Sequence, residues 1–122
     1  MARLLLIEDN NELREMLHTT LAEKGHTIVE ARDGKEGMKA YSSDKFDVVI
    51  TDILMPNKDG IETIFELRHM HPGVRIIAIT GGGAIMSVKD CAEIAKNLGI
   101  KHVLKKPFNI ATLDTCIAYE MA

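Results

Sequence analysis

The sequence predicts an α/β fold in which a five-stranded parallel sheet is covered by helices on both faces. Apolar runs of strand length alternate five times with segments of helical periodicity, which indicates βαβ crossovers and therefore parallel strands. The runs are apolar at almost every position, as expected for strands that are buried on both faces. Turn-forming residues stand at the predicted boundaries, at Gly25, Asp33-Gly34, Pro72-Gly73 and Gly99.

The predicted strands are the short apolar runs themselves. In chain order they are Leu4–Ile7, Thr27–Val29, Val48–Ile50, Val74–Ile79 and, with a weaker apolar pattern, His102–Leu104. Between and after them the spacing of apolar residues changes from that of a strand to that of a helix. The chain therefore contains five strand–helix units and no internal repeat or linker.

The predicted helices each present one apolar face. Residues 11 to 24 give the clearest pattern, with apolar positions at i, i+3, i+4 and i+8, namely Leu13, Met16, Leu17 and Leu21. Asp33 with Glu36, and Asp59 with Glu62, have the spacing of helix-capping boxes, and Asn109 can cap the last helix. The faces of the last two helices are Ile85, Val88, Ala92, Ala95 and Leu98 for residues 84 to 98, then Ile110, Leu113, Ile117 and Met121.

Length and composition favour one ordinary globular domain spanning residues 1–122. A chain of this length can bury about two-thirds of its unfolded surface. With 46% hydrophobic and 27% charged residues, it is neither disordered nor fibrous in composition. The net charge of −3 and the lack of a basic stripe argue against nucleic-acid binding by this domain alone.

The two cysteines, Cys91 and Cys116, lack the spacing of a zinc site or a disulfide framework, and we expect both to be reduced core residues. The apolar run from Leu4 is much shorter than a signal-peptide core and is interrupted at Glu8. No segment approaches transmembrane length. We therefore expect no membrane contact and a cytoplasmic location.

Three acidic residues follow two of the predicted strands. Glu8 and Asp9 come directly after the first strand, and Asp52 follows the third. If these strands are neighbours, the carboxylates converge at the edge of the sheet where open α/β folds place their ligands. We hypothesise that they hold one Mg²⁺, for which Mn²⁺ could substitute, because hard oxygen ligands suit this ion. Asp9 and Asp52 would ligate it directly, the backbone carbonyl of Leu54 would add a neutral ligand, and Glu8 would act through water.

The alternative is that these acids are merely solvated strand ends or helix caps. A lysine near the other end of the chain argues against it. Lys106 stands before Pro107, directly after the fifth predicted strand, so that strand would bring an ammonium group to the acids. It could neutralise them, or bind an incoming anion such as a phosphoryl group. Thr80, which ends the fourth run, adds a hydroxyl group.

The complete set of motifs resembles the receiver domain of bacterial two-component response regulators, of the chemotaxis-regulator type. The motifs are Glu8-Asp9 after strand one, Asp52 with Met55-Pro56 and Asp59-Gly60 after strand three, Thr80 after strand four, and Lys106-Pro107-Phe108 after strand five. The resemblance extends from Leu4 to about Tyr119. It implies a flavodoxin-like three-layer (βα)5 sandwich, with strand order 2-1-3-4-5 and its site at the switch point between strands one and three.

The resemblance also implies a signalling role. Asp52 would be the phosphoacceptor, receiving a phosphoryl group from a sensor histidine kinase or a phosphotransfer protein. Mg²⁺, Lys106 and Thr80 would each contact a phosphoryl oxygen. The domain would take part in its own phosphorylation and dephosphorylation rather than act as an enzyme. The signal would pass to an effector through the face of the fourth helix, fifth strand and fifth helix, with a phosphorylation-dependent dimer as one possible outcome.

Two positions depart from the family pattern. The residue after Thr80, commonly alanine, is Gly81, the first of three glycines. Three residues before Lys106, where the family often has a tyrosine or phenylalanine that changes rotamer, this chain has Val103. A valine cannot swing a ring, and strand alternation points the neighbouring His102 to the opposite face. The resemblance further implies a cis peptide bond between Lys106 and Pro107.

Competing functions fit the sequence less well. A flavodoxin would present a hydroxyl-rich loop after the first strand, where this chain has Glu8-Asp9, and a dehalogenase-like phosphatase would have an acid at Leu54. Gly81-Gly82-Gly83 matches no nucleotide-binding motif. His69 and His71 are interpreted as exposed turn residues. A phosphorylation-independent interaction module on the same fold would leave the acids and the lysine without a purpose. The sequence does not distinguish a stand-alone receiver from part of a larger regulator.

Overall fold

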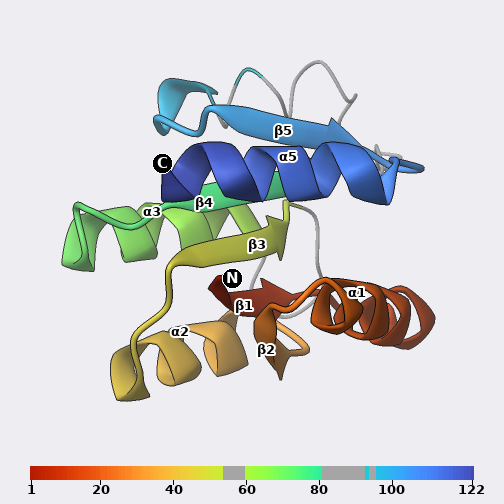
Figure 1. Cartoon of the computed structure of the whole chain (residues 1–122). Coiled ribbons are helices and arrows are strands. Elements are labelled where there is room, and N and C mark those ends of the chain that lie inside the picture. Colours follow the sequence, from red (N-terminus) through yellow and green to blue (C-terminus); the bar gives the residue numbers. More distant parts are fainter. Residues whose placement is uncertain (54–59, 81–92, 94–95) are drawn as a thin grey trace.

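The computed structural model describes residues 1–53, 60–80, 93 and 96–122. A five-stranded parallel sheet runs through the molecule in the order β2-β1-β3-β4-β5 (Figure 1). This confirms the flavodoxin-like fold and the predicted strand order. The elements are β1 (Arg3–Ile7), α1 (Asn11–Glu23), β2 (Thr27–Ala31), α2 (Gly34–Ser43), β3 (Val48–Asp52), α3 (Gly60–Met70), β4 (Ile76–Thr80), β5 (His102–Lys105) and α5 (Ile110–Met121).

Alternation of side chains along the strands divides the core into two halves. On one face of the sheet, Leu5, Val49 and Ala78 belong to a cluster that α3 completes with Ile64 and Leu67. On the other face, a second cluster contains the buried side chains Leu4, Leu6, Val48, Ile50, Ile77, Ile79, Leu17, Leu21, Leu113 and Ile117. The strands are thus buried on both sides, which is why their sequences are apolar throughout.

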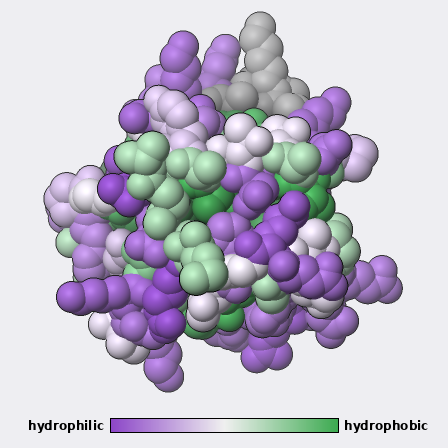
Figure 2. Space-filling view, in the orientation of Figure 1, coloured by the Kyte–Doolittle hydropathy of each residue, from purple (hydrophilic) through white to green (hydrophobic). Residues whose placement is uncertain are grey.

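Helices α1 and α5 cover the second face and pack against each other (Figure 1). Figure 2 shows the outer surface of this side, where hydrophilic side chains predominate at the margins and the most hydrophobic residues are recessed between them. Helices α2 and α3 lie together on the opposite face. In the described part of the chain, no helix has both the length and the apolarity needed to cross a membrane.

The register of the strands brings their carboxyl ends to one edge. Ile7 pairs with Thr51, Asp52 with Ile79, and Thr80 with Lys105. In Figure 1 the arrowheads of β3 and β5 point to the same side of the molecule. Residues that directly follow these strands are therefore collected at this edge, as the sequence predicts.

The predicted face of the first helix is wrong at one position. Leu17 and Leu21 are fully buried and Leu13 is half-buried, but Met16 is 46% exposed. Arg14 is buried instead. The buried stripe of α1 therefore includes positions 14, 17 and 21. The guanidinium group of Arg14 can leave water because it donates hydrogen bonds to Glu8, Asn11 and Glu30.

Two of the predicted capping residues, Asp33 and Asn109, cap their helices, and Asn10, which was not predicted as a cap, does the same for α1. The side chains of Asn10, Asp33 and Asn109 accept hydrogen bonds from the first-turn N–H groups of α1, α2 and α5. The predicted cap Asp59, and the face predicted for residues 84 to 98 except for the half-buried Leu98, lie outside the described residues. In α5, Leu113 and Ile117 are buried as predicted, whereas Met121, in the last turn, is 36% exposed.

The remaining predictions concern single residues. Cys116 is a free, buried thiol, as expected, and Cys91 lies outside the described residues. His71 is half-buried rather than exposed, because its ring packs against Tyr41 with the ring centroids 4.7 Å apart. His26 accepts a hydrogen bond from the Ala2 N–H at Nδ1, and its Nε2 lies 2.8 Å from Asp114 Oδ1. It joins the start of β1 to α5, a structural role that the sequence did not suggest.

Candidate functional site

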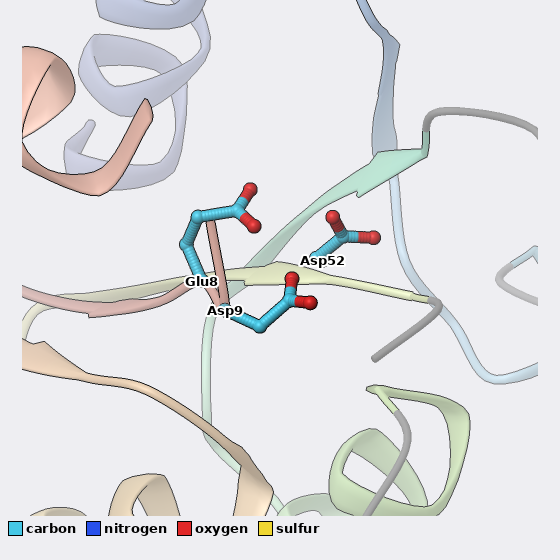
Figure 3. A group of neighbouring side chains, drawn as sticks. All are labelled: Glu8, Asp9 and Asp52. Carbon is cyan, nitrogen blue, oxygen red and sulfur yellow. The ribbon is translucent and has the colours of Figure 1, made fainter. Parts of the chain in front are cut away.

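Three carboxylates meet at the carboxyl edge of the sheet. Glu8 and Asp9 directly follow β1, and Asp52 is the last residue of β3, the neighbouring strand. One oxygen of each side chain lies within 4.8 Å of the others, and Figure 3 shows the three carboxylates gathered around a common space. Glu8 is fully buried and Asp52 is 3% exposed, while Asp9 is open to solvent. The predicted acidic cluster is therefore present in the fold.

Lys106 reaches this cluster from the end of β5. Its Nζ donates a hydrogen bond to Asp52 Oδ2 at 2.6 Å and lies 3.0 Å from Glu8 Oε1. The backbone N–H of Lys106 donates to the carbonyl of Thr80, which anchors this residue to the end of β4. The Lys106–Pro107 peptide bond is cis, as expected. One ammonium group thus contacts carboxylates that come from two different strands.

The electrostatics of the site follow from three neighbouring acids with one lysine, which pairs with Glu8 and Asp52. Burial raises the pKa of Glu8 to about 7, and the negative charge of Asp52 adds to this effect, while hydrogen bonds from the Asn10 N–H and from Lys106 oppose it. Burial lowers the pKa of Lys106, but hydrogen bonds and charge from Asp52 and Glu8 outweigh it, so that this pKa lies above its ordinary value. The site therefore carries excess negative charge that a further cation would neutralise.

The donor set fits a hard divalent cation. All three side chains offer carboxylate oxygens, the ligand type that Mg²⁺ and Mn²⁺ prefer. Glu8 Oε1 is buried, and among the described residues its partner is the Lys106 ammonium group, which lies 3.0 Å away as an ion pair. A carboxylate oxygen has two lone pairs, so an oxygen with this single partner can also accept a hydrogen bond from water. The predicted carbonyl ligand, Leu54, lies outside the described residues.

Thr80 and the residues near it frame the other side of the site. Thr80 is the last residue of β4, next to β3, and is fully buried. Val103 packs, half-buried, on the same side of the sheet as α3. His102 lies on the opposite side, as strand alternation predicts, with its ring edge-on to Tyr119 of α5 at a centroid distance of 4.9 Å. Gly81 to Gly83 lie outside the described residues.

Two further residues shape the site: the sequence pattern indicated no role for Arg14, and it included Gly60 only as part of the Asp59-Gly60 motif. Arg14 is 8% exposed and donates a hydrogen bond to the backbone carbonyl of Glu8. Its position three residues before Leu17 was the available signal, but a charged residue there is usually solvated. Gly60 begins α3, and its N–H donates to the carbonyl of Ile53 at 2.8 Å.

Gly60 lies against the backbone of Asp52. A Cβ atom at this position would be 1.8 Å from the Asp52 carbonyl oxygen, a contact that no side-chain rotation could relieve. We predict that Gly60→Ala lowers the free energy of unfolding by about 3 kcal/mol, because the end of β3 must move to make room. Gly73→Ala is the matched control, since nothing lies within 4 Å of a Cβ there. Urea unfolding of both variants checks this, and equal losses would contradict it.

Comparison with known proteins gives a consistent result. The family model of the response regulator receiver domain matches residues 4–118. The response regulator receiver protein CpdR of Brucella abortus is 32% identical over 115 residues, which cover 93% of this chain and 91% of CpdR. The crystal structure of the response regulator TrrA from Thermotoga maritima, in complex with Mg²⁺-BeF, is 28% identical with a TM-score of 0.82, covering 98% of this chain and 99% of that one.

Many relatives are longer than this chain. The transcriptional regulatory protein GlrR of Escherichia coli is 33% identical over 106 residues, which are 87% of this chain but 23% of GlrR. The chain spans less than half the length of the first curated relatives that it matches. The similarity is thus to one domain of those proteins.

Proposed function

This chain belongs to the response regulator receiver domain family, and we propose that it serves a two-component system as the domain whose Asp52 accepts a phosphoryl group. The observation that carries this proposal is the place of Asp52 in the sheet. It ends β3, with Glu8 and Asp9 beyond β1 on one side, and with Thr80 of β4 and then Lys106 beyond β5 on the other. No other described carboxylate lies between an acidic cluster and a lysine in this way.

In the proposed reaction, a carboxylate oxygen of Asp52 forms a bond to the phosphorus of a phosphohistidine. The bond between that phosphorus and the imidazole nitrogen breaks, and its electron pair leaves with the imidazole. The products are an aspartyl phosphate and an unphosphorylated histidine on a sensor kinase or phosphotransfer protein. A carboxylate is a modest nucleophile, so the site must act mainly by alignment and by neutralising charge.

The neighbouring residues divide these tasks. Asp9 and Asp52 would bind Mg²⁺ directly, the Leu54 carbonyl would add a ligand, and Glu8 would act through water. Bound Mg²⁺, or Mn²⁺ in its place, supplies positive charge to the oxygens of the phosphoryl group. Lys106 would exchange its contact with Asp52 for one with a phosphoryl oxygen, and the Thr80 hydroxyl would donate to another. The 2.6 Å contact of Lys106 with Asp52 supports this assignment because the ammonium is already at the acceptor.

We also propose two classes of partner for this chain. A sensor histidine kinase or a phosphotransfer protein would supply the phosphoryl group, and an effector would read the change on the surface of β5, α5 and the segment before β5. If the partner is a second copy of this chain, the output would be phosphorylation-dependent dimerisation. With Val103 at the position where an aromatic ring is common, we propose that the output does not depend on a rotating ring on β5.

Intact-mass spectrometry after incubation with acetyl phosphate tests the proposed function. We expect one phosphoryl group per chain in the presence of Mg²⁺, and none when a chelator removes the metal. Size-exclusion chromatography of the same sample reports whether the phosphorylated chain dimerises. Failure to gain mass with either acetyl phosphate or a phosphorylated kinase would favour the phosphorylation-independent interaction module.

Mg²⁺ affinity is expected to depend on pH. With the pKa of Glu8 at about 7, most of its carboxyl groups are protonated at pH 6, and a neutral Glu8 lacks the negative charge that favours Mg²⁺ and its bound water. The apparent affinity should therefore rise about 10-fold between pH 6 and pH 8, then level off. Glu8→Gln should bind more weakly at pH 8 and show a flatter profile. Calorimetric titrations at the two pH values check this, and a wild-type affinity that does not change would contradict it.

A further inference from the structure

We infer that Arg14 is a positioning residue of the acidic site, whose buried guanidinium fixes the turn bearing Glu8 and Asp9 and so sets the affinity of that turn for Mg²⁺. The inference rests on the proposed function, because it concerns how the same acids are held. Arg14 would act indirectly, because it contacts the backbone of the turn and not a carboxylate of the cluster.

Arg14 uses its fork of donors on three different partners. Nη1 donates to the backbone carbonyl of Glu8 at 2.9 Å, Nη2 donates to Asn11 Oδ1 at 2.7 Å, and Nε donates to Glu30 Oε1 at 2.9 Å. The bond to the Glu8 carbonyl is itself buried, so it is little weakened by water. A planar guanidinium can satisfy such a set at once, which a single ammonium cannot.

These bonds complete the restraint of Glu8. Its N–H donates to the carbonyl of Ala31 at the end of β2, and its Oε2 accepts from the Asn10 N–H at 3.1 Å. The Glu8 carbonyl belongs to the planar peptide unit that also contains the nitrogen of Asp9. By holding that carbonyl, Arg14 fixes the orientation of the peptide plane from which Asp9 departs. The hydrogen bond from Arg14 to Glu30 connects this arrangement to β2, the strand to which Glu30 belongs.

The positive charge of Arg14 cannot explain a higher affinity of the turn for Mg²⁺. Glu30 neutralises the guanidinium, and the other oxygen of Glu30 lies 2.5 Å from His18 Nδ1. Removing the positive charge of Arg14 would by itself leave Glu30 negative and favour Mg²⁺ binding. A positioning role predicts that removing Arg14 weakens Mg²⁺ binding, because a turn that has lost its hydrogen bonds must be ordered again when the metal binds. The direction in which the Mg²⁺ affinity changes therefore distinguishes an effect of charge from an effect of positioning.

Titration calorimetry with MgCl₂ at pH 8, without a phosphoryl donor, tests the inference. Arg14→Met keeps the long apolar stem but removes every donor, and we expect it to bind Mg²⁺ about 10-fold more weakly than the wild type. Saturating Mg²⁺ should then restore most of its phosphorylation by acetyl phosphate, since the Asp52 and Lys106 side chains are unchanged. Arg32→Met is the matched control, because Arg32 is 70% exposed in its side chain and pairs only with Glu36 among the described residues.

Arg14→Lys is a second variant that can be tested if Arg14→Met does not fold. It keeps the positive charge but can no longer donate to the Glu8 carbonyl, Asn11 and Glu30 together, so a several-fold loss of affinity is expected. Circular dichroism establishes that each variant is folded at the temperature of the titration. If the wild type binds Mg²⁺ and the folded Arg14 variants bind equally or more tightly, this inference alone is overturned. If the wild type binds no Mg²⁺, the proposed metal site fails, and the inference with it.

Discussion

Asp52→Asn is expected to abolish phosphorylation by acetyl phosphate in the presence of Mg²⁺. The amide has nearly the shape of the carboxylate, so it should be accommodated at a position that is 3% exposed. It lacks the negatively charged oxygen that must form the bond to phosphorus, and it is a poorer ligand for a hard cation. Intact-mass spectrometry should show no phosphorylated species under conditions that label the wild type.

The control for this variant is an aspartate away from the site. Asp44 follows α2 and pairs with Arg3, far from the carboxyl edge of the sheet. Asp44→Asn removes the same charge and should be phosphorylated as fully as the wild type. A phosphorylated species of Asp52→Asn in equal yield would mean that another residue is the acceptor.

Lys106→Met should impair both stability and phosphorylation. Without Mg²⁺ at pH 8, it leaves Glu8 and Asp52 buried without their shared cation, and we expect a loss of about 2 kcal/mol in the free energy of unfolding. The loss of a charged contact to the phosphoryl group should slow phosphorylation on the order of 100-fold even at saturating Mg²⁺. Urea unfolding and the time course of the mass change measure the two effects.

The stability effect of Lys106→Met should depend on pH. A folded-state pKa of about 7 for Glu8 lies above the ordinary value of 4.5, so Glu8 favours the folded state most below pH 4.5 and loses that contribution as the pH rises through 7. Removing Lys106 raises this pKa further, so the difference from the wild type should be largest at pH 8 and should shrink by pH 5. Lys105→Met, at an exposed neighbouring position, is the control. Equal losses for the two lysines at pH 8 would contradict the account.

The sheet and the site could be predicted because their signals are local. The runs around Leu6 and Ile50 are apolar at every position since both faces of β1 and β3 are buried. Parallel pairing then places whatever follows each strand at one edge, so Asp52 and Glu8 had to be near each other. Lys106 joined them by the same rule applied to β5.

What the sequence could not give depends on contacts between distant segments. Helical periodicity gives the width of an apolar face but not its centre, and the centre here depends on Glu30, which accepts a hydrogen bond from Arg14. The pairing of His26 with Asp114 joins residues that are far apart in the chain, so no local pattern signals it. Strand β4 begins at Ile76 rather than Val74, although Val74 is buried in the core, since burial and strand pairing are separate properties.

The most direct test of the central claim is to locate the phosphoryl group. Borohydride reduction converts an aspartyl phosphate into homoserine and leaves phosphate esters of serine and threonine unchanged, so peptide mapping after reduction reports the acceptor. Wild-type chain treated with acetyl phosphate and Mg²⁺ is expected to yield homoserine at position 52 and at no other aspartate. Homoserine at position 9 or elsewhere, or none in a sample that has gained the mass of a phosphoryl group, would contradict the account.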